Sequence, residues 1–162
     1  MTGLFAVMGW KGDIMETFNY LEIKPSQRFD DLDPNQDGNK NTKFADLIID
    51  GKSIYQILKK HDMVPSLGWG SAENQREMID YFLLIDHHEY MYNRYPVLVC
   101  PMCGDEECGF ISVQIEREGD IVIWENFKKE NDSNPINLGP FYFEINNYER
   151  AIRKTFGTVG FE

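Results

Sequence analysis

Apolar and polar residues alternate along the second half of the chain with a period of two, which predicts β-strands. In segment 110–116, Ile111, Val113 and Ile115 alternate with polar residues, so one face of this strand should be buried. The sequence Glu-Gly-Asp at 118–120 is typical of a tight turn. This turn predicts a hairpin between segment 110–116 and the apolar segment that follows. The predicted strands are 18–24, 43–49, 97–100, 110–116, 121–124 and 141–145.

Three other segments have the period of about 3.6 residues that is typical of amphipathic helices. Ser53 and Ser71 are predicted N-caps of the first two, and Asn146 or Asn147 caps the third, which Gly157 should end. The predicted buried positions are Ile54, Ile57 and Leu58 in the first helix, Ala72, Ile79, Phe82 and Leu83 in the second, and Tyr148, Ala151, Ile152, Thr155 and Phe156 in the third.

These elements together predict an α+β fold, in which a mainly antiparallel sheet of about five to six strands packs with about three helices. The 162 residues, of which 42% are hydrophobic, suit one globular domain, and we place it at residues 18–162. This apolar fraction is too high for an intrinsically disordered chain. Met15 can serve as a second start, so residues 1–17 are expected to form a poorly ordered N-terminal extension.

The net charge of −11 narrows the possible partners. Binding to nucleic acid requires a basic surface that neutralises phosphates, so the charge argues against direct nucleic-acid binding and favours a basic protein partner. The segment from Asp105 to Glu149 holds eleven acidic and three basic residues, a net charge of −8. Such clustering costs stability through self-repulsion, so it serves either solubility or docking of a basic partner.

The sequence also favours a cytoplasmic protein without a membrane segment. A signal peptide requires a positively charged residue before its apolar segment, but no Lys or Arg precedes the mildly apolar residues 4–8. No stretch approaches the roughly 18 consecutive apolar residues that span a bilayer. Three cysteines within residues 100–108 make a poor disulfide framework, which fits a reducing compartment.

The clearest local motif is the cysteine cluster Cys100, Cys103 and Cys108. Two cysteines separated by two residues can bind one tetrahedral zinc ion, and Cys108 could be a third ligand. A structural zinc site needs four ligands, and the sequence does not choose the fourth among His61, His87, His88 and Asp105. The alternative is that Cys100 and Cys108 are small buried residues that flank a tight turn between two strands. We therefore predict no cofactor, with a structural zinc ion as the open alternative.

Three stretches of the chain resemble a family of small acidic proteins of Gram-positive bacteria that often carry the label oxidoreductase. The stretches are FADLIIDGKS at 44–53, LGWGS at 67–71, and VLVCPMCGDEECG at 97–109, the last followed by EREGD at 116–120 and VIW at 122–124. Within that family, the chain is most similar to immunity proteins of cell-wall-associated contact-dependent toxins of bacilli, whose toxic domain is a tRNA nuclease. The chain has no nicotinamide or flavin motif that supports the label oxidoreductase.

The resemblance implies a protein that binds and neutralises a co-encoded nuclease, a basic toxin domain. Its acidic surface would present carboxylates where the nuclease binds phosphates. We predict no catalytic residue, because no nucleophile, base and orienting group can be assigned together. The alternative is a small zinc- or thiol-dependent enzyme that uses Cys100, Cys103 and Cys108. The predicted partner-binding residues are Asp105, Glu106, Glu107, Glu116, Glu118 and Asp120.

Overall fold

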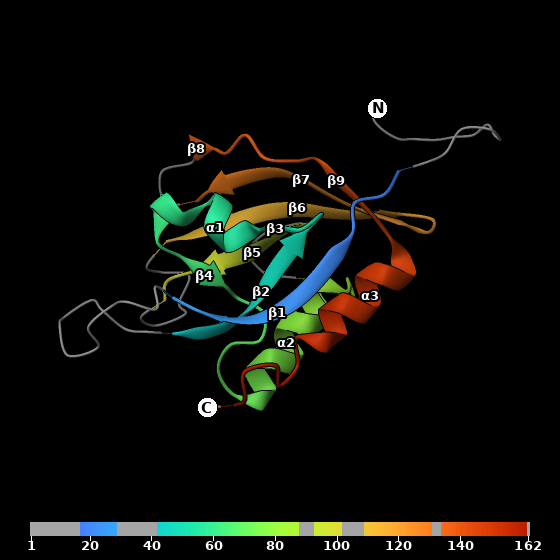
Figure 1. Cartoon of the computed structure of the whole chain (residues 1–162). Helices are drawn as coiled ribbons and strands as arrows, with labels where there is room; N and C mark the ends of the chain where they lie inside the picture. Colours follow the sequence, from blue (N-terminus) through green and yellow to red (C-terminus); the bar gives the residue numbers. More distant parts are fainter. Residues whose placement is uncertain (1–16, 29–41, 88–92, 102–108, 131–133, 162) are drawn as a thin grey trace.

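Two antiparallel sheets form the frame of the protein (Figure 1). The structure, a computed structural model, describes residues 17–28, 42–87, 93–101, 109–130 and 134–161. Three strands form the smaller sheet, in the order β1-β2-β3, and six form the larger one. The larger sheet has the order β4-β5-β6-β7-β8, and β9 also pairs with β7. The strands are β1 Leu21–Gln27, β2 Lys43–Ile49, β3 Lys52–Ser53, β4 Val64–Pro65, β5 Arg94–Val99, β6 Phe110–Glu118, β7 Ile121–Lys129, β8 Asn134–Pro135 and β9 Phe141–Glu144.

The predicted hairpin is the centre of the larger sheet. Strands β6 and β7 pair from Glu118 and Ile121 next to the turn to Ile111 and Lys129 at the far end. A register shift between Ser112 and Gln114 interrupts this ladder. The opposite side of β7 pairs with β9 near the turn and with β8 at the far end, so β7 has partners on both sides.

Helices α2 Ala72–Phe82 and α3 Ile145–Lys154 lie on one side of the larger sheet, while α1 Ile54–Ile57 packs against the smaller sheet (Figure 1). The short 3-10 helix η1 Lys59–His61 follows α1. The side chains of Ser53 and Ser71 accept hydrogen bonds from backbone amides in the first turns of α1 and α2, which confirms both predicted caps. Among the described residues, no helix is long and apolar enough to cross a membrane.

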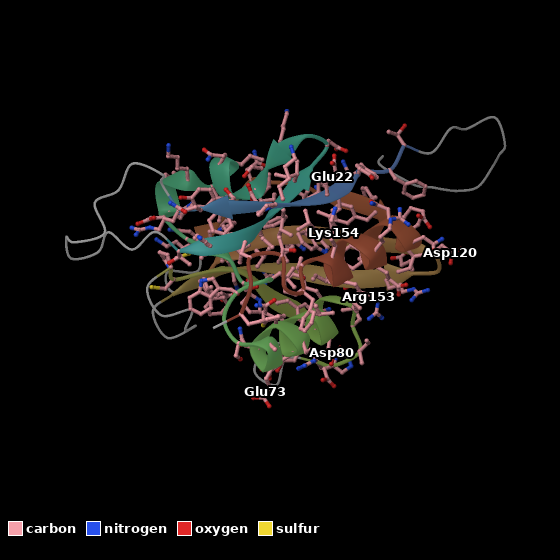
Figure 2. All side chains as sticks on the ribbon, turned by 60° about the horizontal axis from the view of Figure 1, so that its bottom comes forward. Glu22, Glu73, Asp80, Asp120, Arg153 and Lys154 are labelled. Carbon is pink, nitrogen blue, oxygen red and sulfur yellow. The ribbon has the colours of Figure 1, made fainter. Side chains whose placement is uncertain are left out.

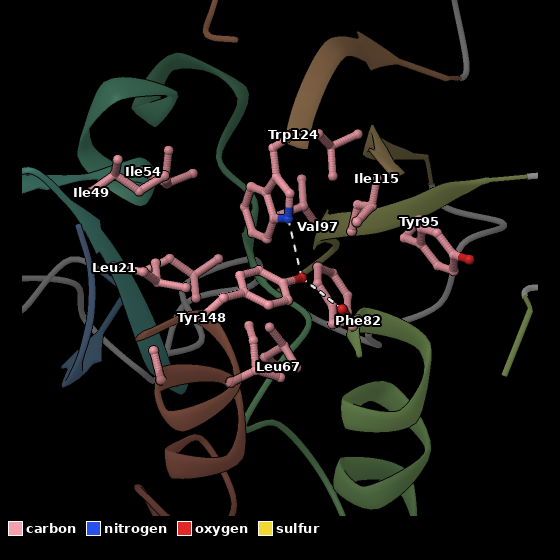
Figure 3. Close-up of a cluster of buried hydrophobic side chains, with 14 of the residues drawn as sticks. Leu21, Ile49, Ile54, Leu67, Phe82, Tyr95, Val97, Ile115, Trp124 and Tyr148 are labelled. Carbon is pink, nitrogen blue, oxygen red and sulfur yellow. Dashed lines mark hydrogen bonds between the residues drawn. The ribbon is translucent and has the colours of Figure 1, made fainter. Parts of the chain in front are cut away.

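The main core lies between the larger sheet, the smaller sheet and the two longer helices (Figure 3). Trp124 of β7 is fully buried at its centre, and its ring lies 5.8 Å from Phe82 of α2 and 6.1 Å from Tyr148 of α3. Leu21 and Ile49 extend the same core into the smaller sheet. One continuous core therefore connects both sheets to the helices. Burial of each large apolar side chain in it contributes roughly 1.5–3 kcal/mol to the stability of the fold.

The α+β class is confirmed, but several details of the prediction are wrong. The strands form two sheets and not one, and β1 begins at Leu21 and continues through Pro25 to Gln27. The N-cap of α3 is Glu144, whose side chain accepts hydrogen bonds from the backbone amides of Asn146 and Asn147. Ile145 begins this helix and is not the end of the last strand. Two side chains predicted to be buried, Ile57 and Phe156, are 44% and 39% exposed.

Candidate functional site

The candidate site is the outer face of the β6–β7 hairpin, which lies on the side of the larger sheet opposite Trp124. Successive side chains of a strand point to opposite faces, so the residues that alternate with buried Val122 and Trp124 point away from the core. We use the name outer face for Gln114, Glu116 and Glu118 of β6, Ile121, Ile123 and Glu125 of β7, and Tyr142 of β9.

The strand register places carboxylates around an apolar centre on this face. Glu116 is directly opposite Ile123, and Ile123 is directly opposite Tyr142, so these three side chains form one row across the sheet. Glu118 lies opposite Ile121 in the next row. Side chains in such cross-strand pairs are about 4.5–5.5 Å apart at Cβ. Ile121, Ile123 and Tyr142 are only partly buried, so apolar surface remains accessible between the carboxylates.

The charge on this face perturbs Tyr142. Burial, and then the negative charges of Glu125 and Glu118, raise the pKa of the Tyr142 hydroxyl above its ordinary value of 10.0. The two carboxylates come from neighbouring strands, and both act on the same phenol group. The register of β6, β7 and β9 thus places both carboxylates near enough to Tyr142 to act on its hydroxyl group.

Hydrogen bonds hold one of the carboxylates in place. Oε2 of Glu116 accepts hydrogen bonds from Asn93 Nδ2 at 3.2 Å and from Gln114 Nε2 at 2.8 Å. The side chain of Gln114 is itself fixed, because its Oε1 accepts a 2.8 Å hydrogen bond from Asn126 Nδ2. Glu116 is therefore oriented before any partner arrives, which lowers the entropic cost of binding.

Charges are compensated at the end of the sheet far from the turn. Glu130 lies within 3.4 Å of Arg94 Nε and within 3.6 Å of Lys128 Nζ. Its Oε2 also accepts a hydrogen bond from Ser112, whose hydroxyl oxygen accepts one from Arg94 Nε. These contacts explain why Ser112 is buried, although the alternation predicts an exposed side chain.

The end near the turn lacks such compensation among the residues that the structure describes. No Lys or Arg there forms an ion pair with Glu116, Glu118, Asp120 or Glu125. Arg117 instead donates a hydrogen bond from Nε to the Gly119 carbonyl oxygen at 2.8 Å. Among the described residues of the larger sheet, the carboxylates without an ion pair therefore include those at the hairpin end, where Figure 2 shows Asp120 at the tip.

The structure brings together three of the six predicted partner-binding residues. Glu116 and Glu118 lie on the outer face, and Asp120 is exposed in the turn beside it. The other three, Asp105, Glu106 and Glu107, lie outside the described residues. Glu125 and Tyr142 were not predicted from the sequence, although Glu125 follows Ile121 and Ile123 with the same period of two.

The cysteine cluster is only partly described. Cys100 follows β5 and is partly exposed, while Cys103 and Cys108 lie outside the described residues. The carbonyl oxygen of the next residue, Pro101, accepts a 2.6 Å hydrogen bond from the hydroxyl group of Thr42, the residue before β2. Within the described ranges, no group of three or more His, Cys, Asp or Glu side chains could hold a metal ion. Zinc binding by this cluster stays a prediction.

Comparisons of the chain with protein families, with curated proteins and with solved structures find no match. The outer face carries the carboxylates of Glu116, Glu118 and Glu125 around a partly buried apolar centre, and hydrogen bonds hold that of Glu116 in place.

Proposed function

We propose that the protein is an immunity protein that binds and neutralises a co-encoded contact-dependent tRNA nuclease through its outer face. The observation that carries this proposal is the arrangement of Glu116, Glu118 and Glu125 around Ile121, Ile123 and Tyr142. Protein interfaces commonly combine such a central anchor with a polar rim. The proposal places the encounter in the cytoplasm, where tRNA is the substrate of the toxin.

The chemistry of a nuclease explains why carboxylates suit this partner. A protein that binds RNA presents Lys and Arg side chains to the phosphates. Carboxylates can form charge-assisted hydrogen bonds with the same Lys and Arg side chains. Glu118 and Asp120, both exposed at the hairpin end, would attract the basic surface at long range and speed association. The protein would then occupy the surface to which tRNA binds.

The partly buried apolar side chains account for retention of the complex. Long-range attraction between charges mainly raises the association rate, whereas well-packed anchors at the centre of an interface slow dissociation. Tyr142 is the strongest anchor on this face, because tyrosine combines a large apolar ring with a polar hydroxyl group. Ile123 lies directly beside it.

Co-expression with the neighbouring toxin domain tests this proposal. Cells that produce the nuclease domain alone should lose tRNA and die, and cells that also produce this protein should survive. The two proteins should copurify as a complex. If no complex forms and the cells still die, the proposal is wrong.

A further inference from the structure

A groove on another part of the surface lies where helix α1, the end of β7 and strand β8 come together (Figure 1). Its volume is about 520 Å³, within the range of roughly 300–1,000 Å³ that is usual for small-molecule sites. We call it the cationic groove. The helical segment 57–61 lines one side of it, and Lys129 of β7 with residues 134–138 lines the other.

The described residues that line the groove are basic or uncharged, whereas the chain as a whole is acidic. Lys60, His61 and Lys129 supply cationic or hydrogen-bonding groups from two separate parts of the fold, the helical segment after Ser53 and strand β7. None of the ten described residues that line the groove is acidic, although the chain has a net charge of −11. The side chains of Lys60, His61 and Lys129 are hydrogen-bond donors of the kind that bind an anion.

Apolar side chains accompany these cations. Ile57 at the groove is 44% exposed, although Ile54 of the same helix and Leu58, its C-cap, are buried. Ile136 and Leu138 add apolar surface from the opposite wall. A site of this kind can hold an apolar body as well as an anionic head group.

The helical wall of the groove is fixed by a charge pair behind it. Arg28 is 5% exposed and donates hydrogen bonds from Nε and Nη2 to the two carboxylate oxygens of Asp62, at 2.8 and 2.6 Å. Such bidentate pairs combine strength with a defined geometry. Asp62 follows His61 directly, so this contact fixes the end of η1 from which His61 reaches the groove.

The second wall is fixed by backbone hydrogen bonds to β7. Asn134 pairs with Lys129 in the sheet, and the amide of Ile136 donates a 2.8 Å hydrogen bond to the carbonyl oxygen of Phe127. The amide of Leu138 then donates to the carbonyl oxygen of Ile136 at 2.9 Å. Both walls are thus formed before any ligand arrives.

We propose that the cationic groove binds a small molecule that has an anionic head and an apolar body. The head, a phosphate or a carboxylate, binds Lys60, His61 and Lys129. The body packs against Ile57, Ile136 and Leu138. The site is independent of the outer face, so its ligand and the nuclease are recognised by different residues.

Nuclear magnetic resonance titrations of the full chain with phenyl phosphate test this proposal. We expect saturable shifts of the backbone amide signals of Leu58, His61, Lys129 and Ile136. Benzoate distinguishes a carboxylate site from a phosphate site, because the head group that the groove prefers gives the lower dissociation constant. Phenol and inorganic phosphate, which each lack one half of the ligand, should both bind at least tenfold more weakly than the preferred anion.

A matched pair of double variants separates this site from general attraction by surface charge. The double variant with Lys60→Gln and Lys129→Gln should raise the dissociation constant of the preferred anion about tenfold or more. Lys43→Gln with Lys154→Gln removes the same charge from exposed residues outside the groove and should leave binding within twofold. The absence of saturable shifts with both anions, equal binding of phenol, or an equal effect of the two double variants overturns the proposal. The outcome does not depend on nuclease binding.

Discussion

The hydroxyl group of Tyr148 donates a 2.6 Å hydrogen bond to the backbone carbonyl oxygen of Phe82 (Figure 3). Phe82 is the last residue of α2, so its carbonyl oxygen has no partner within the helix. The same hydroxyl oxygen accepts a 3.2 Å hydrogen bond from Trp124 Nε1. Complete burial raises the pKa of Tyr148, which keeps the hydroxyl protonated and able to donate. One phenol group thus joins α3, the end of α2 and the centre of the larger sheet.

Replacement of Tyr148→Phe should destabilise the protein by about 1–3 kcal/mol, because two buried polar groups lose their partner while the aromatic ring remains. The free energy of unfolding from urea denaturation measures this loss. Tyr20→Phe is the matched control, since Tyr20 is 52% exposed. The interpretation fails if both variants have the same stability as the parent protein.

The burial of the Asp46 carboxylate should make the stability of the protein depend on pH. This carboxylate of β2 is 5% exposed, and burial raises its pKa above 3.8, although a hydrogen bond from the Ser53 hydroxyl partly opposes the shift. A raised pKa in the folded state means that the folded protein binds the proton more tightly than the unfolded chain does. The stability that Asp46 contributes is therefore greatest below pH 3.8 and is lost as the pH rises through the pKa of the folded protein.

The Asp46→Asn variant tests this sign, because asparagine cannot ionise. The free energy of unfolding of the variant minus that of the parent should increase as the pH rises from about 4 to 7. Urea denaturation of both proteins across this range gives the difference. Parallel stability curves would contradict the effect of burial on Asp46.

The perturbed Tyr142 hydroxyl reports directly on the geometry of the outer face. A double variant with both Glu118→Gln and Glu125→Gln should lower the pKa of Tyr142 toward 10.0, because it removes two negative charges that raise this pKa. The tyrosine Cζ chemical shift, followed against pH, measures this change. Tyr95 is the internal control, because burial raises its pKa and no carboxylate contributes. An unchanged pKa at Tyr142 means that the carboxylates are not gathered at the apolar centre.

The sequence predicts well those elements whose signals are local. Residues 43–49 form the predicted strand, and the turn at 118–120 closes the predicted hairpin. Ser71 caps α2 as its position suggests, because an N-cap depends only on its own hydroxyl and the next few backbone amides. These are interactions between residues close together in the chain.

The details of the fold that were predicted wrongly depend on contacts between residues far apart in the sequence. Pro25 is tolerated within β1 because β1 is at the edge of its sheet, and pairing order is not visible in the sequence. Asn147 does not cap α3, because its side chain turns inward and exchanges two 3.0 Å hydrogen bonds with the backbone of Leu21. A contact between residues 126 positions apart cannot be inferred from local patterns.

The candidate site could be predicted only in part, for the same reason. Alternation along β6 places Glu116 and Glu118 on an outward face, as the hairpin prediction implies. The row that adds Tyr142 depends on the pairing of β7 with β9, whose residues are 19 positions apart at Ile123 and Tyr142. The acidic segment was therefore visible as a charge excess, but its apolar centre was not.

The association rate with the nuclease domain tests the role of the outer face most directly. Stopped-flow measurements should compare two double variants. The first combines Glu118→Lys and Glu125→Lys on the outer face. The second combines Glu73→Lys and Glu77→Lys, which makes the same change of charge at exposed positions of α2 (Figure 2 labels Glu73). Replacement on the outer face should slow association roughly tenfold at low salt, and the difference should shrink as salt screens the charges. If both double variants associate at the same rate, the outer face does not bind the nuclease.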